Sequence, residues 1–232
     1  MTLHKSNRQG YLCRMRKFED TYRHKGMRRK LVESIRQKGI TAANVLEAMD
    51  RLPRHYFLDS AFDEVAYEDK AFPILEKQTI SQPYTVAYQT ELLETRPHCK
   101  VLEIGTGSAY QACVLAELGV QLFTIERQKK LFENNKTFEY IKRYRNIKFF
   151  YGDGYEGLPT YAPFDRILIT AAAPEIPVKL IEQLKTGGMM VIPMGEGSVQ
   201  VMKRLTKLED GNLHTEVFDK FSFVPMLGGK NN

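Results

Sequence analysis

The chain has 232 residues, of which 43% are hydrophobic, 27% charged and 11% aromatic. This composition is that of a globular domain, and it excludes low-complexity and fibrous chains. The sequence has no run approaching the roughly 20 apolar residues of a membrane helix. Its three cysteines form no CxxC pair, which favours a reducing, cytoplasmic setting.

The positive charge of the chain is concentrated near its N-terminus. Net charge is +6, but residues 1–30 carry ten Lys and Arg against two acids, whereas the remaining residues carry 24 against 26. The main body is therefore nearly neutral, which disfavours nucleic-acid binding. We expect residues 1–26 to form a basic, poorly ordered leader; the alternatives are an upstream start artefact and a weak electrostatic anchor.

The first elements predicted along the chain are helical. Apolar residues at helical spacing predict a helix from Met27 that stops at Gly39, a typical C-terminal signal. Thr41 is the expected N-cap of a second helix that ends near Asp50. Residues 54–88 read as an irregular stretch, rich in aromatic residues, that carries the polar segment QTISQPYT.

Short apolar runs then alternate with helical stretches. Such alternation indicates βαβ units and a mostly parallel, doubly wound α/β sheet with helices on both faces. Two final strands alternate polar and apolar residues with no helix between them, which predicts an antiparallel edge. The expected strands are 100–105, 121–126, 146–152, 164–170, 187–193, 198–205 and 213–221, and the expected helices are 108–118, 128–142, 155–158 and 177–185. The N-terminal helices are an addition to this sheet.

The first strand-to-helix turn, VLEIGTGSAYQ, suits a ligand-binding loop. Gly105 and Gly107 let the backbone turn sharply and approach a ligand, although a glycine turn alone is weak support. Glu126 ends the second strand, where a carboxylate can accept both ribose hydroxyls of an adenosine. The third strand ends in Gly-Asp-Gly, where Asp153 could accept a hydrogen bond from an adenine amino group. Strand ends of a parallel sheet share one edge, so these groups are expected to meet.

The residues around this turn favour one adenosine cofactor over another. A dinucleotide fold would prefer a third glycine where the chain has Tyr110, and Glu103 would repel a pyrophosphate. An acidic first strand better suits a cationic sulfonium. The sequence therefore favours S-adenosylmethionine over NAD.

The order and spacing of several motifs resemble those of the protein-L-isoaspartate O-methyltransferase family. The motifs are QTISQPYTVA, VLEIGTGSAYQ, GDGYEGLP, APFDRILITAAAPEIP and FVPML, and the resemblance runs from about Met27 to Leu227. It implies a class I S-adenosylmethionine-dependent methyltransferase (Rossmann-like) fold in a single domain, 27–232. Within it, 27–98 would form the helical and substrate-loop region and 99–232 the cofactor-binding core. The chain departs from the family at Ala109, where glycine is usual; its methyl group is strained if φ is positive.

The resemblance also implies an activity. Members transfer methyl from S-adenosylmethionine, leaving S-adenosylhomocysteine, to the free carboxylate of L-isoaspartyl residues in damaged proteins and peptides, which are then repaired through a succinimide. That carboxylate is ionised at neutral pH, so the enzyme must position it and needs no strong base. Ser81 matches the catalytic serine, expected to orient the carboxylate. On the residues alone, Ser81 would more readily be a turn residue before Pro83.

By the same matching, two further groups of residues are implied. Those expected around the cofactor are Glu103, Gly105, Thr106, Gly107, Ser108 and Tyr110 for the methionine and ribose, Glu126 for the ribose, and Asp153 and Gly154 for the adenine. Those expected around the acceptor are Thr79, Ile80, Gln82, Pro83, Ala171 and Val224. The expected partners are isoaspartyl proteins and peptides, with no nucleic acid, no membrane and a monomeric state.

A metal site is not expected, since the five histidines show no HExxH or paired-ligand spacing. Two other functions remain open from the residues. One is a methyltransferase acting on a small molecule or a nucleic acid. The other is a non-enzymatic binding module with a degenerate cofactor pocket, suggested by Ala109.

Overall fold

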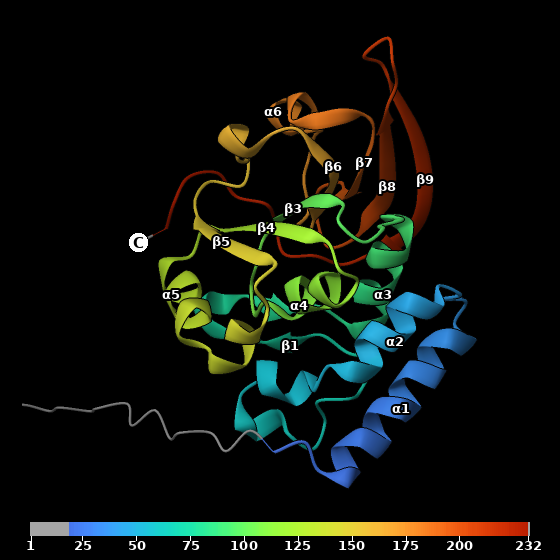
Figure 1. Cartoon of the computed structure of the whole chain (residues 1–232), viewed down its shortest axis with the longest axis vertical. Coiled ribbons are helices and arrows are strands. Elements are labelled where there is room, and N and C mark those ends of the chain that lie inside the picture. Colours follow the sequence, from blue (N-terminus) through green and yellow to red (C-terminus); the bar gives the residue numbers. More distant parts are fainter. Residues whose placement is uncertain (1–18, 232) are drawn as a thin grey trace, which may run out of the picture.

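A seven-stranded sheet forms the centre of the molecule, with strand order β5-β4-β3-β6-β7-β8-β9 (Figure 1). The computed structural model describes residues 19–231, so residues 1–18 of the expected leader lie outside it. The parallel strands are β3 (Lys100–Ile104), β4 (Gln121–Glu126), β5 (Ile147–Tyr151), β6 (Phe164–Ile169) and β7 (Leu184–Met194). Two antiparallel strands, β8 (Gln200–Lys207) and β9 (Leu213–Phe221), complete one edge, as predicted.

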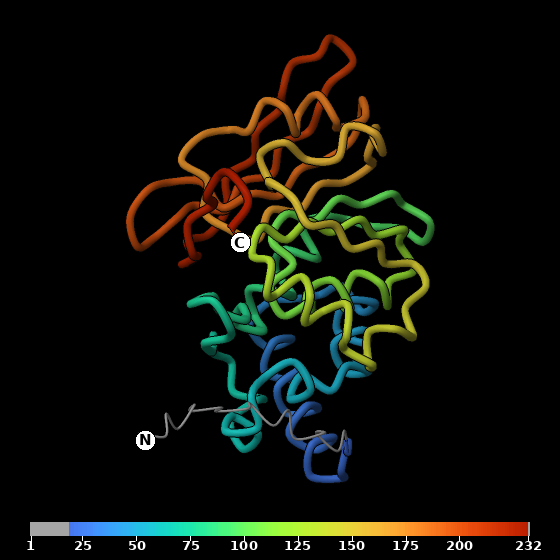
Figure 2. The backbone as a smooth tube through the Cα atoms, turned by 90° about the vertical axis from the view of Figure 1, so that its left-hand side faces the viewer, coloured from blue at the N-terminus to red at the C-terminus, as the bar shows by residue number. Residues whose placement is uncertain are grey.

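Helices cover both faces of this sheet. They are α1 (Tyr22–Gln37), α2 (Ala43–Arg51), α3 (Pro83–Leu92), α4 (Tyr110–Glu117), α5 (Lys129–Thr137) and α6 (Val178–Glu182). A small hairpin of β1 (Phe72–Pro73) and β2 (Thr79–Ile80) precedes α3. In Figure 2 the N-terminal third, blue to teal, forms a tier below the sheet, and the C-terminal strands, orange to red, lie at the opposite end.

The N-terminal helices differ from the prediction at their starts. Helix α1 begins at Tyr22, five residues before Met27, so part of the expected leader is helical. Its start is fixed by Thr21, whose hydroxyl accepts a hydrogen bond from the His24 N–H, while the His24 ring accepts one from the Thr21 N–H. The capping box is hard to recognise in the sequence because its fourth residue is histidine, where Glu or Gln is usual.

The N-cap of α2 is Ala42 and not the predicted Thr41. A carboxylate from another helix takes over the capping role, since Glu91 on α3 accepts hydrogen bonds from the backbone N–H groups of Thr41 and Ala42 at 2.7 and 2.6 Å. Its negative charge also suits the positive end of the helix dipole. Helix α3 itself was not predicted; Pro83 occupies its first turn, where a missing N–H costs nothing.

The segment after β5 also departs from the prediction. No helix forms over 155–158, where turns lead into a single 3₁₀ turn at Pro159–Tyr161. The predicted helix over 128–142 is α5 followed by a separate 3₁₀ turn, Glu139–Arg143. Prediction errors here are confined to short connections between strands that were placed correctly.

Side chains on the two faces of the sheet form two separate cores. Along β3, Val101 packs in the core shared with α4 and the N-terminal helices, while Leu102 and Ile104 pack in the core shared with α6. This alternation follows from the two-residue period of a strand. Within residues 19–231, no helix is long and apolar enough to cross a membrane.

The turn between β3 and α4 is held against the end of β6. Gly105 has φ +95°, and a Cβ built on it would lie 2.6 Å from the Thr170 hydroxyl oxygen. That hydroxyl donates to the carbonyl oxygens of Ile104 and Gly105, at 2.9 and 2.7 Å. Gly107 also has positive φ, but a Cβ there would meet only Ile74, at an ordinary 3.8 Å.

Gly105→Ala is therefore expected to destabilise the fold more than Gly107→Ala. The first substitution combines backbone strain with a collision that disrupts the Thr170 hydrogen bonds, about 2–4 kcal/mol in total. The second adds only left-handed backbone strain, about 1–2 kcal/mol. Urea unfolding of both variants measures the difference; equal losses of unfolding free energy would contradict the close approach at Gly105.

Candidate active site

A pocket opens where the carboxyl ends of β3, β4 and β6 meet. This is the edge at which open α/β sheets bind ligands. Twelve of the residues expected from the sequence line it: Thr79, Ile80, Ser81, Gly105, Thr106, Gly107, Ser108, Tyr110, Glu126, Gly154, Ala171 and Val224. The structure thus brings the ends of β3, β4, β5 and β6 and the TIS segment together around one cavity.

Glu126 is the buried carboxylate of this pocket, only 5% exposed. Its two oxygens accept hydrogen bonds from the backbone N–H groups of Gly107 and Gln128, both at 2.8 Å. Burial raises the pKa of Glu126, and these N–H donors oppose that shift. Each carboxylate oxygen keeps a second lone pair, so the group is oriented and can still accept two hydroxyl donors.

Glu103 lies behind the pocket wall instead of lining it. The Thr124 hydroxyl donates to one carboxyl oxygen at 2.6 Å and is 2.7 Å from the Thr106 hydroxyl, which faces the pocket. The other oxygen has no hydrogen-bond partner within residues 19–231. Burial, with a smaller contribution from the charge of Glu126, raises the pKa of Glu103 to about 8. The expected negative charge beside the ligand is therefore largely neutralised at pH 7.

Asp153 is not part of the pocket lining. Its carboxylate accepts hydrogen bonds from the backbone N–H groups of Tyr155, at 2.9 Å, and Gly229, at 2.6 Å. Gly229 belongs to the C-terminal segment, residues 227–231, which Arg127 also holds through two carbonyl oxygens. A hydrogen bond from adenine to Asp153, as predicted, would compete with this contact. The adjacent Gly154 does line the pocket, and a Cβ there would lie 2.5 Å from Ile104.

The C-terminal segment narrows the pocket. It crosses the ends of β4 and β5, where Asn231 pairs with Gln128, and Figure 1 shows it returning in red towards α5. The enclosed volume is about 100 Å³, below the roughly 300–1,000 Å³ of pockets that bury a whole ligand. The pocket as it stands is therefore smaller than a site that encloses a whole nucleoside.

A wider groove adjoins the pocket on the side of α3 and β9. It encloses about 520 Å³ and shares four residues with the pocket: Thr79, Ser81, Thr170 and Val224. Gln82 lines this adjoining groove only, and Pro83 lines neither cavity because it is buried in the first turn of α3. In the side-chain hydrogen bonds of residues 19–231, Ser81 takes part through its carbonyl oxygen, which accepts from Arg54, and not through its hydroxyl. It lies at the junction of the two cavities.

Sequence inspection missed several residues of the site. Gln111, in the first turn of α4, lines the pocket with a buried side-chain oxygen that has no partner in the described chain. Thr170 follows β6 and holds Gly105. Arg54, fully buried, donates to the carbonyl oxygen of Ser81 at 3.1 Å. The strand-end position of Thr170 could have revealed it, whereas a single arginine in an irregular stretch carries no such signal.

Ala109, which stands where the family usually has glycine, adopts a backbone conformation with positive φ. Its φ is +65° and its ψ is +13°, the left-handed region, at the N-cap of α4. A non-glycine residue pays about 1–2 kcal/mol there. Its methyl group is fully buried, and this burial stabilises the fold by roughly 0.8 kcal/mol, which offsets part of the strain. The turn therefore keeps the geometry of a glycine turn despite the substitution.

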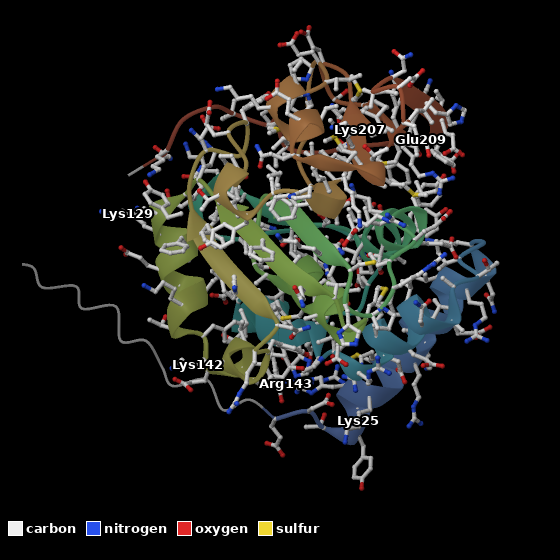
Figure 3. The ribbon with its side chains drawn as sticks, turned by 45° about the horizontal axis from the view of Figure 1, so that its top comes forward. Lys25, Lys129, Lys142, Arg143, Lys207 and Glu209 are labelled. Carbon is white, nitrogen blue, oxygen red and sulfur yellow. The ribbon has the colours of Figure 1, made fainter. Side chains whose placement is uncertain are left out.

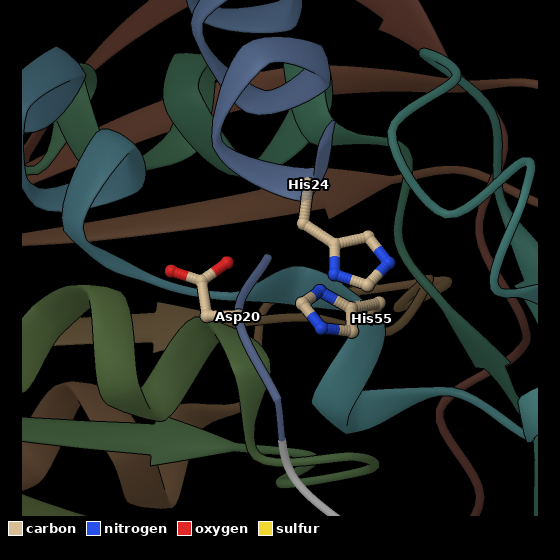
Figure 4. A group of neighbouring side chains, drawn as sticks. All are labelled: Asp20, His24 and His55. Carbon is tan, nitrogen blue, oxygen red and sulfur yellow. The ribbon is translucent and has the colours of Figure 1, made fainter. Parts of the chain in front are cut away.

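A histidine cluster lies away from the pocket, near the start of α1 (Figure 4). Donor atoms of Asp20, His24 and His55 lie within 4.8 Å of one another, and the two imidazoles stack at 3.8 Å. The cluster is nevertheless a hydrogen-bonded junction, because Arg28 binds both oxygens of Asp20 at 3.0 Å and all the ring nitrogens have partners. Burial, reinforced by His24, lowers the pKa of His55 to about 4 and keeps it neutral.

Comparison with known proteins identifies the family. A model of the protein-L-isoaspartate(D-aspartate) O-methyltransferase family matches residues 26–231. The chain belongs to this family. It is 57% identical over 210 residues to the protein-L-isoaspartate O-methyltransferase of Cytophaga hutchinsonii, spanning 90% of this chain and 95% of that relative. The Flavobacterium psychrophilum relative is 51% identical over 213 residues, or 92% and 100% of the two chains.

Solved structures of the family share the fold. One protein-L-isoaspartate O-methyltransferase superposes with a TM-score of 0.78 and 27% identity, covering 87% of this chain and 66% of that chain. A Plasmodium falciparum protein, described as a protein-L-isoaspartate O-methyltransferase in complex with S-adenosyl-L-homocysteine, gives a TM-score of 0.73 at 24% identity, covering 86% and 98%. The expected class I methyltransferase fold is confirmed.

The buried carboxyl of Glu103 predicts a specific pH dependence of stability in this family member. The folded pKa of about 8 exceeds the unfolded value of 4.5, so the native state binds more protons between these values. The proton on Glu103 therefore stabilises the folded protein. This contribution to the free energy of unfolding is complete below about pH 4.5 and is lost as the pH rises towards 8. The side chain of the Glu103→Gln variant cannot ionise, so this variant escapes that loss. The difference in unfolding free energy between the variant and wild type should therefore shift by roughly 2–4 kcal/mol in favour of the variant as the pH is raised from about 5 to 8.5.

Urea unfolding at several pH values tests this. Glu133→Gln, at an exposed position on α5, is the matched control and should run parallel to wild type. Parallel curves for Glu103→Gln as well would show that Glu103 ionises normally in the fold.

Proposed function

We propose that this chain transfers a methyl group from S-adenosylmethionine to the free carboxylate of L-isoaspartyl residues in damaged proteins and peptides. The observation that carries the proposal is the junction at Ser81, where a nucleoside-type pocket and a wider groove share one wall. A methyltransferase needs its donor and acceptor sites to meet in this way. Family membership from 26 to 231 supports the same activity.

The pocket residues suit S-adenosylmethionine. Glu126 would accept the ribose hydroxyls, since its carboxylate is already oriented by the N–H groups of Gly107 and Gln128. Gly105 and Gly154 let the strand ends that form the pocket wall pack closely, because a Cβ would lie 2.6 Å from Thr170 at the first position and 2.5 Å from Ile104 at the second. Gln111 offers a buried acceptor without a protein partner, suited to a donor such as an ammonium group. The bound cofactor supplies a methyl group made electrophilic by the sulfonium and leaves as S-adenosylhomocysteine.

Positioning is the main task of the protein in this reaction. An isoaspartyl carboxylate is ionised at neutral pH and is itself the nucleophile. One oxygen must lie near 3 Å from the methyl carbon, in line with the bond that breaks. The Ser81 hydroxyl, at the junction and without another partner in the described chain, would donate to the other oxygen and fix that orientation. No covalent intermediate with the protein is required.

The acceptor chain would reach Ser81 through the adjoining groove. Thr79 and Gln82 would border the groove from the β2–α3 side, and Val224 from the sheet side. Ile80 and Ala171 line the adjacent pocket and would meet the acceptor only where it reaches the methyl donor. The small side chain of Ala171 suits close approach of a peptide backbone. The methyl ester that leaves the site would cyclise to a succinimide, whose hydrolysis yields normal aspartate in part.

We extend the proposal to the setting of the protein. We propose a monomer in the cytoplasm that acts on isoaspartyl proteins and peptides and on no nucleic acid. The near-neutral charge beyond residue 30 supports the last point. In Figure 3 the labelled side chains of Lys25, Lys129 and Lys207 lie at well-separated places in the view.

A paired-peptide assay tests the activity. Labelled S-adenosylmethionine is incubated with the protein and with two peptides identical except for an isoaspartyl or a normal aspartyl residue. We expect label to enter the isoaspartyl peptide only and to be released by base, as an ester is. Equal labelling of both peptides would reject the proposed specificity.

Ser81→Ala is the matched variant for this assay. Loss of a hydrogen bond to a charged group costs about 1.5–3 kcal/mol, so kcat/KM for the isoaspartyl peptide should fall about 10- to 150-fold. S-adenosylhomocysteine affinity, measured by calorimetry, should change little. An unaltered kcat/KM would remove Ser81 from the mechanism.

A further inference from the structure

Arg54 is a fully buried cation that forms no ion pair with a carboxylate within residues 19–231. It begins a 3₁₀ turn, Arg54–Phe57, and its side chain donates to three backbone carbonyl oxygens. Its Nε donates to Ala66 at 3.1 Å, and its Nη2 donates to Lys70 at 3.3 Å and to Ser81 at 3.1 Å. Its Nη1 has no hydrogen-bond partner within residues 19–231.

This arrangement costs stability. A buried guanidinium loses hydration that only a counter-charge and complete hydrogen bonding restore, and burial lowers the pKa of Arg54 to about 10. Arg28 shows the usual solution in the same molecule: it is 6% exposed and pairs with both oxygens of Asp20. Arg54 forms no such ion pair within residues 19–231; Tyr110 and the charge of Asp69 offset its burial only in part, so its position calls for an explanation other than stability.

The contacts of Arg54 reach both sides of the site. Its guanidinium carbon lies 4.9 Å from the centre of the Tyr110 ring, a cation–π contact, and Tyr110 lines the cofactor pocket. On the other side it holds the backbone of Ser81, the residue at the junction with the groove. One rigid, planar group therefore sets the spacing between a wall of the donor site and the residue that faces the acceptor.

The segment 79–84 is fixed from its other end by Asp69. That carboxylate accepts from the backbone N–H of Tyr84 at 2.8 Å and from the Gln82 side chain at 3.1 Å. The backbone around Ser81 is thus tied on two sides, while its hydroxyl makes no hydrogen bond in the described chain. A fixed backbone with a free hydroxyl is what orientation of an acceptor carboxylate requires.

We infer that Arg54 is a positioning residue for methyl transfer: it fixes the backbone of Ser81 relative to Tyr110, and so the acceptor carboxylate relative to the methyl donor. This inference rests on the proposed function for its kinetic consequence. Its structural consequence, the immobility of segment 79–84, is measured without any activity.

Arg54→Gln is the primary test, and Arg166→Gln is its matched control. Arg166 also donates to three backbone carbonyl oxygens, those of Leu93, Glu94 and Asp165, but it lines neither cavity. Both substitutions are expected to lower the melting temperature. Arg54→Lys is the second variant; it keeps one charged donor and is used if the glutamine variant does not fold.

Amide hydrogen exchange gives the activity-independent readout. In Arg54→Gln, segment 79–84 should exchange at least about tenfold faster than in wild type, as expected for the loss of a charged hydrogen bond. In Arg166→Gln that segment should exchange as in wild type, with faster exchange only near the end of α3. Arg54→Lys should lie between wild type and Arg54→Gln.

Steady-state kinetics give the second readout. In Arg54→Gln, KM for an isoaspartyl peptide should rise about tenfold or more, while the S-adenosylhomocysteine dissociation constant, measured by calorimetry, should change less than about threefold. Arg166→Gln should change neither. The inference is overturned if Arg54→Gln and Arg166→Gln raise the KM for the peptide equally. It is also overturned if the amides of 79–84 exchange in Arg54→Gln as they do in wild type. A wild-type protein that methylates no isoaspartyl peptide rejects the proposed function instead, and hydrogen exchange then decides the positioning role alone.

Discussion

The site depends on how closely three strand ends approach one another. The backbone after β3 lies against Thr170 at the end of β6 and, through Gly107, against Glu126 at the end of β4. No side chain fits between Gly105 and Thr170 at the end of β6, or between Gly154, after β5, and Ile104 at the end of β3. Backbone amides and one buried carboxylate therefore form the pocket wall directly. This is the geometry in which a sheet edge can grip a nucleoside through fixed dipoles rather than through mobile side chains.

The central fold is readable from the sequence because its strands are buried on both faces. Five apolar runs separated by helical stretches leave few alternatives to a parallel sheet, and all seven predicted strands form. The starts of the two N-terminal helices were missed for different reasons. Glu91 caps α2 from a helix 50 positions away, so that boundary is a tertiary feature. The start of α1 is local, but His24 takes the place in the capping box that is normally held by an acid or an amide.

The site was predictable where it follows the strand ends and unpredictable where it lies behind them. Twelve expected residues line the pocket because the carboxyl ends of parallel strands share an edge. Glu103 lies behind the pocket wall because it alternates with Leu102 and Ile104 and so faces the α4 layer, a position that the two-residue period of the strand would have predicted. Asp153 lies outside the pocket lining, where it binds the N–H of Gly229 from the far end of the chain; local sequence could not show this contact. The burial of Arg54 depends on the packing of distant segments, so it could not be predicted from the sequence.

The C-terminal segment has a practical consequence. Residues 227–231 are anchored by Arg127, Asp153 and Gln128 across the opening of the pocket. A polypeptide fused after Asn232 would follow almost directly on this anchored segment, so an affinity tag placed there is expected to disturb the contacts of residues 227–231 beside the pocket. A tag at the opposite terminus avoids the problem, and recombinant material for binding measurements is best prepared in that way.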